Sequence, residues 1–90
     1  MKIVINDCYG GYSLSPWALK ILGINNSNEL RRENPRLVFY VEGNAIEAAG
    51  RNAHLRVVEV PSDATDYEIV EYAGKESVVY VKDGHLHWIK

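Results

Sequence analysis

The chain has 90 residues, of which 47% are hydrophobic and 24% charged, and its formal net charge is −2 at pH 7. This length holds one hydrophobic core, so we expect a single domain over residues 1–90. The composition excludes intrinsic disorder, and the negative charge argues against direct nucleic-acid binding through phosphate neutralisation. The longest apolar run is far shorter than the ~18 residues of a membrane span, so no membrane partner is expected.

The single cysteine, Cys8, excludes an intrachain disulfide and a multi-cysteine metal site. No signal-peptide pattern is present, and together these features predict a cytoplasmic protein. Charge is distributed unevenly along the chain, because residues 59–90 carry seven acidic residues against three lysines. The C-terminal third is therefore expected to present an acidic surface.

The first elements are predicted by a β-branched run and by helix capping signals. Residues 2–6 contain a continuous apolar stretch that is typical of a short buried strand. Ser15 followed by proline predicts a helix start, and Gly23 predicts its end, which gives a helix over residues 16–22.

The segment after Asn34-Pro35 is compatible with two structures. Residues 37–42 alone resemble a strand, but apolar residues then recur every three or four positions up to Gly50. Gly43 would cost about 1 kcal/mol inside a helix, which a long amphipathic helix can absorb. We favour a helix over residues 35–49.

The remainder of the sequence predicts four strands and two turns. The strands are expected at residues 55–60, 67–72, 77–81 and 85–89. Asp83-Gly84 is a strong two-residue hairpin signal. The order β-α-α-β-β-β-β predicts an α+β domain of two layers, with a mainly antiparallel sheet and two helices on one face.

The segment from Asn6 to Ser15 is the candidate ligand-binding site. A strand there breaks into a double-glycine loop just before a helix start, an order that can present backbone N–H groups to an anion. The glycines allow close approach of a ligand, and the tyrosines can stack on a base. The predicted ligand-binding residues are Asn6, Cys8, Tyr9, Gly10, Gly11, Tyr12, Ser13 and Ser15. The alternative is a tight strand-to-helix connection in which the glycines only turn the chain.

No catalytic or metal constellation stands out. The thiol of Cys8 has no histidine near it in sequence, so a small buried thiol is favoured over a nucleophile. His85 and His87 share one face of a strand, which with a third ligand would suit zinc. We favour instead a solvent-facing pair opposite a buried Leu86 and Trp88. No cofactor and no metal are predicted.

Two charged groups offer further contacts. The acidic stretch is either a partner-binding surface or a solvated sheet that resists pairing with other chains. Its partner-binding residues would be Glu59, Asp66, Glu68, Glu71 and Glu76. The cluster of Arg31, Arg32 and Arg36 would either pair with phosphate or offset these acids.

The N-terminal segments Ile3-Val4-Ile5-Asn6, Cys8-Tyr9-Gly10-Gly11-Tyr12 and Leu14-Ser15 resemble the signature of a group of small, mostly uncharacterised phage and prophage accessory proteins. Similarity extends to residues 35–38, 48–50, 55–61 and 67–72. Asp7 departs from the group, which usually has Arg there. The resemblance implies expression in the cytoplasm of a bacterial host and an accessory role, and it supplies no activity.

The function predicted from these features is that of a non-catalytic counter-defence binder. It would sequester a small nucleotide-type signal through the strand-loop-helix at residues 6–15, as a homo-oligomer. The alternative is a protein-binding inhibitor of a host or defence factor that acts through the acidic C-terminal sheet.

Overall fold

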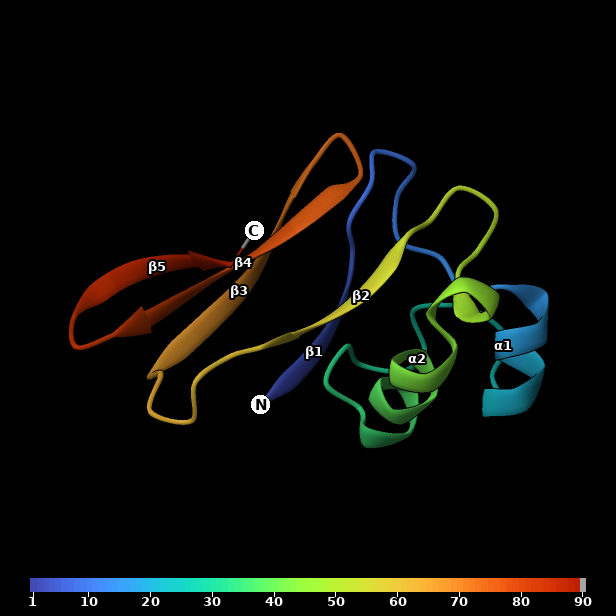
Figure 1. Cartoon of the computed structure of the whole chain (residues 1–90), viewed down its shortest axis with the longest axis horizontal. Helices are drawn as coiled ribbons and strands as arrows, with labels where there is room; N and C mark the ends of the chain where they lie inside the picture. Colours follow the sequence, from blue (N-terminus) through green and yellow to red (C-terminus); the bar gives the residue numbers. More distant parts are fainter. Residues whose placement is uncertain (90) are drawn as a thin grey trace.

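The computed structural model describes residues 1–89, which form two helices and five strands in the order β-α-α-β-β-β-β (Figure 1). The helices are α1 (Pro16–Leu22) and α2 (Pro35–Ala48), and the strands are β1 (Lys2–Asn6), β2 (Leu55–Glu59), β3 (Asp66–Tyr72), β4 (Lys75–Lys82) and β5 (His85–Ile89). The predicted α+β class and element order are confirmed.

The strands form two antiparallel sheets rather than one. β1 pairs with β2 in a two-stranded ribbon, and β3, β4 and β5 form a separate meander. No strand of the meander pairs with the outer edge of β1, because the N–H groups on this edge donate to other acceptors. The Val4 N–H donates to the Arg32 carbonyl at 2.9 Å, and the Asn6 N–H donates to Glu76 Oε1 at 2.8 Å.

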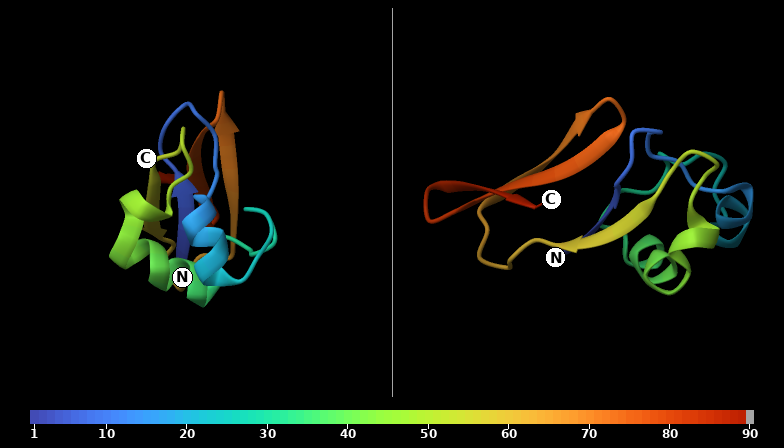
Figure 2. Two further views of the ribbon diagram at one scale, coloured as in Figure 1. Left: turned by 90° about the vertical axis from the view of Figure 1, so that its right-hand side faces the viewer. Right: turned by 45° about the horizontal axis from the view of Figure 1, so that its top comes forward.

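The β1–β2 ribbon lies between the helices and the three-stranded sheet (Figures 1 and 2). Because side chains alternate along a strand, Val4 faces α1 and α2, whereas Ile3 and Ile5 face β4. Each face has its own hydrophobic cluster, one against the helices and one around Val78. This double coverage explains why β1 is apolar without interruption.

The predicted helix signals are confirmed in detail. The Ser15 hydroxyl accepts from the Ala18 N–H at 3.0 Å, and Gly23 ends α1 in the left-handed conformation at φ 71°. Residues 37–42 are helical, as favoured. Asn44 has non-helical angles, φ −144° and ψ 42°, so α2 is kinked beside Gly43.

Two tight turns connect the strands of the meander. Asp83 and Gly84 have φ of 53° and 76°, which is the two-residue turn that the sequence predicts. Ala73 and Gly74 form the β3–β4 turn with φ of 51° and 92°. Within residues 1–89, neither helix has the length and apolar character needed to cross a membrane.

Candidate functional site

The Gly10-Gly11 loop is wedged between two other loops. A Cβ on Gly10 would lie 1.7 Å from the Asn52 carbonyl oxygen, and a Cβ on Gly74 would lie 2.5 Å from the Tyr9 carbonyl oxygen. Gly10 and Gly74 are therefore both required, because a side chain at either position would prevent the close approach of two backbone segments. This tight packing agrees with the alternative interpretation of residues 6–15, a tight connection between a strand and a helix.

The side-chain amide of Asn6 holds these loops together. It is fully buried, and its Nδ2 donates to the Cys8 and Gly74 carbonyls at 2.7 Å each. Its Oδ1 accepts from the His54 N–H at 2.8 Å and lies 3.4 Å from the Cys8 sulfur. These bonds use both N–H donors and the carbonyl oxygen of the amide, so Asn6 fixes the loop against the segments that contain His54 and Gly74.

Other predicted ligand-binding residues are also engaged within the protein. The Ser15 hydroxyl caps α1 and donates to the Glu47 carbonyl at 2.7 Å. The Ser13 carbonyl accepts from the Gly50 N–H at 2.9 Å, and the Cys8 thiol donates to the Asn52 carbonyl at 3.0 Å. The first turn of α1 is thus closed by its own cap.

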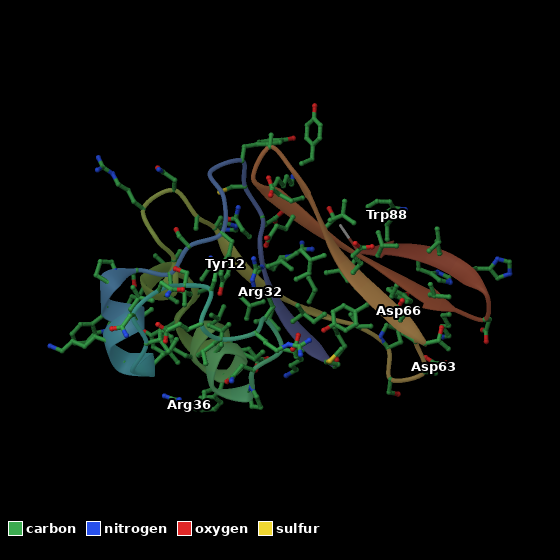
Figure 3. All side chains as sticks on the ribbon, turned by 180° about the vertical axis from the view of Figure 1, so that it is seen from behind. Tyr12, Arg32, Arg36, Asp63, Asp66 and Trp88 are labelled. Carbon is green, nitrogen blue, oxygen red and sulfur yellow. The ribbon has the colours of Figure 1, made fainter. Side chains whose placement is uncertain are left out.

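Tyr12 covers an ion pair beneath the loop. The guanidinium carbon of Arg32 lies 3.4 Å from the Tyr12 ring centroid (Figure 3). The Nη1 and Nη2 atoms of Arg32 donate to Glu76 at 2.7 and 2.8 Å. Burial raises the pKa of Tyr12, an effect that the Arg32 charge opposes and the Glu76 charge adds to. The Tyr12 hydroxyl is buried and has no hydrogen-bond partner among residues 1–89.

The side chain of Tyr9 lies outside this packed region and lines an open groove together with Trp88. Tyr9 is 66% exposed and Trp88 is 56% exposed. The groove, here named the Tyr9–Trp88 groove, has a volume of about 480 Å³. It is lined by Asp7, Tyr9, Arg56, Lys75, Glu76, Ser77 and Trp88. These residues come from both sheets and from the double-glycine loop, so only the folded chain assembles them.

The groove combines aromatic rings with positive charge. Lys75 Nζ lies 5.6 Å from the Tyr9 ring centroid, within the range of a cation–π contact. Asp7 lies between the two cations, 3.8 Å from Arg56 and 3.9 Å from Lys75. Arg56 Nε is buried and has no hydrogen-bond partner in the described part of the chain. Since Glu76 is paired with Arg32, the remaining charges of the groove favour an anion.

Of the eight predicted ligand-binding residues, only Tyr9 lines this groove. Sequence reasoning missed Arg56, Lys75 and Trp88, which lie on β2, β4 and β5. The sequence predicts that Leu86 and Trp88 are buried, but both are largely exposed. The expectation fails because the β4–β5 hairpin projects past the core (Figure 1), and His87 stacks on Tyr80 with centroids 5.0 Å apart.

The predicted acidic residues are divided among different parts of the surface. Asp66 and Glu68 share one face of β3, and Glu71 lies on the opposite face because side chains alternate. Glu59 is on β2, where its carboxylate pairs with the N-terminal amine at 2.7 Å. Glu76 is only 7% exposed and is therefore not part of any acidic surface.

The arginine cluster separates into three roles. Arg32 pairs with Glu76, Arg31 pairs with Glu33, and Arg36 donates to the Leu22 carbonyl at the end of α1. In residues 1–89 no group of three or more His, Cys, Asp or Glu side chains is arranged to hold a metal ion.

We compared the chain with known protein families, curated proteins and solved structures. No protein-family model, curated protein or solved structure matches the chain.

Proposed function

We propose that this chain is a phage accessory protein of the counter-defence kind, a non-catalytic binder that sequesters a small nucleotide-type ligand. The observation that supports this function is the Tyr9–Trp88 groove, which two exposed aromatic rings line together with Arg56 and Lys75. A nucleotide offers a flat base for an aromatic ring and a phosphate for a cation. The groove therefore matches both chemical halves of such a ligand.

The size and charge of the groove support a small ligand. Its volume of about 480 Å³ lies in the range of about 300–1,000 Å³ that is usual for small-molecule sites. Asp7 is close to both cations, and its carboxylate can accept from a ribose hydroxyl or a base N–H. Ser77 also lines the groove and carries a hydroxyl group.

The double-glycine loop has a supporting role in this proposal. The contact of Gly74 with Tyr9 and the Asn6 bond to the Gly74 carbonyl hold the loop beside Lys75. Tyr9 is thereby presented to the groove by a rigid backbone, which lowers the entropic cost of binding. The phage origin rests on the resemblance of the N-terminal segment to phage proteins.

Native mass spectrometry of the protein purified from a bacterial host is the first test. We expect a released mass of nucleotide size in integer ratio to chains. The identified nucleotide is then titrated against a Trp17→Phe variant, in which Trp88 is the only indole. Stacking on Trp88 should quench its fluorescence, and Tyr9→Ala should weaken binding about 5- to 100-fold.

A matched pair of lysine variants tests the phosphate contact. Lys75→Met should weaken binding and reduce its salt dependence, whereas Lys20→Met on α1 should do neither. If the purified protein carries no ligand, a panel of nucleoside monophosphates and dinucleotides replaces it. Unchanged Trp88 fluorescence across that panel would reject the proposed function.

A further inference from the structure

The strand β5 is the most exposed element of the sheet. Within residues 1–89 its main packing partner is β4. Leu86 is 68% exposed and lies on the same face as Trp88. The hairpin of β4 and β5 extends away from the helices to one end of the molecule (Figures 1 and 2). β5 therefore has little buried surface in a single chain.

The two edges of the meander differ in charge. The β3 edge carries the carboxylates Asp66, Glu68 and Glu71, which protect an edge from pairing with other chains. Residues 85–89 contain no proline and no Asp, Glu, Lys or Arg. A second copy of this acidic chain meets like charge at β3 and none along β5.

The backbone of β5 is arranged for pairing with itself. Lys82 and His85 flank a two-residue turn, so His85, His87 and Ile89 direct their N–H and C=O groups to β4. The groups of Leu86 and Trp88 consequently point to the open edge. An antiparallel partner centred on His87 places Leu86 opposite the Trp88 of the other copy. Within residues 1–89, no strand pairs with β5 on this side.

We infer that β5 is a homodimer edge, at which two copies pair antiparallel about a twofold axis through His87. This register covers all of residues 85–89 and joins the two three-stranded sheets into one of six strands. Leu86 and Trp88 of both copies then form one apolar cluster, which continues onto Val79 and Val81 of β4. The inference does not depend on the identity of any ligand.

The interface is small. Five paired residues bury less than the about 800 Å² per partner of a standard interface, so we expect a dissociation constant of about 1–100 μM. Sedimentation velocity over about 1–300 μM should therefore record a monomer–dimer equilibrium. Leu86→Lys should weaken it at least about tenfold, whereas Phe39→Lys on the exposed face of α2 should leave it unchanged.

Disulfide trapping tests the register. In a Cys8→Ser background, His87→Cys places two cysteines opposite each other at a Cα separation of about 4.5 Å, which suits a disulfide. We expect rapid oxidation to a covalent dimer for His87→Cys and not for Ile46→Cys, which is on exposed α2. Circular dichroism of each variant verifies the fold.

Three outcomes would overturn the inference. The first is a monomer at every concentration, and the second is a dimer that Ile46→Cys traps as readily as His87→Cys. The third is a monomer that instead binds a strand of a host protein in a Leu86-dependent manner, which would assign the edge to another chain. A chain that stays monomeric over the whole concentration range and still binds the nucleotide would reject the dimer and leave the groove proposal intact.

Discussion

Arg32 and Glu76 form a bidentate ion pair that also hydrogen-bonds to backbone groups on the outer edge of β1. Arg32 Nη1 also donates to the Val4 carbonyl at 3.2 Å, and Glu76 Oε1 also accepts from the Asn6 N–H at 2.8 Å. Together with the Arg32 carbonyl, these groups occupy the positions that a neighbouring strand would fill. The pair thus connects the segment before α2 to β4 through the strand between them.

Removal of Arg32 should destabilise the protein strongly. Arg32→Met leaves the Glu76 carboxylate buried without its partner, and we expect a loss of about 3–5 kcal/mol in the free energy of unfolding. Arg31→Met is the matched control, because Arg31 is 85% exposed and such residues change stability by less than about 0.5 kcal/mol. Urea titration measures both. Equal losses in the two variants would contradict the role given to the pair.

Loss of the Tyr12 hydroxyl should not destabilise the protein. Tyr12→Phe keeps the ring over Arg32 and removes a buried hydroxyl that lacks a partner in residues 1–89. We expect a change of about 0 to 1 kcal/mol toward greater stability at pH 7, measured by urea titration. A loss above about 1 kcal/mol would mean that the hydroxyl makes a stabilising bond.

The same variant should flatten the alkaline limb of the stability profile. The folded state raises the pKa of Tyr12 above its ordinary value of 10.0, so the unfolded chain loses this proton first. The contribution of Tyr12 to the free energy of unfolding is fully present below pH 10.0. It is lost as pH rises through the pKa that Tyr12 has in the folded state. Stability measured from pH 9 to pH 11 should therefore fall more steeply in the parent chain, roughly in proportion to that shift. Parallel curves would exclude Tyr12 as the cause.

Two glycine substitutions should change the stability of the protein in opposite directions. Gly10→Ala places a Cβ against the Asn52 carbonyl, and the loop must shift, so we expect a loss of about 2 kcal/mol or more. A Cβ at Gly43 meets no atom of residues 1–89 within 4 Å, and Gly43→Ala reduces the entropy of the unfolded chain. It should stabilise the protein by about 0.5–1 kcal/mol. Thermal unfolding of both variants checks the signs, and a stabilised Gly10→Ala would contradict the observed packing.

Substitution of Asn6 should loosen the loop junction. Asn6→Ala leaves the Cys8 and Gly74 carbonyls and the His54 N–H without their partner, which should cost about 2–4 kcal/mol. Asn28→Ala is the surface control, with an expected change below about 0.5 kcal/mol. Hydrogen exchange of the His54 amide should accelerate in Asn6→Ala alone. Unchanged exchange there would show that the amide is not needed to hold this junction.

Local chemistry in the sequence was sufficient to predict the elements. Ser15 with Pro16, Gly23, Asn34 with Pro35 and Asp83-Gly84 mark ends and turns, because capping and positive φ depend on residues a few positions apart. The α+β class followed from the order of these elements. The candidate site was predicted less well, since Tyr9 is the one predicted ligand-binding residue that lines the groove together with Trp88.

The sequence by itself determined the seven elements, their order and the closeness of a tyrosine-bearing loop to β1. Only the tertiary structure decided that the strands divide into two sheets, that Glu76 is buried against Arg32, and that Trp88 is exposed. The physical reason is the range of the interactions. Caps and turns are set within about four residues, whereas Arg32 meets Glu76 across 44 residues, and such pairings depend on how whole layers pack.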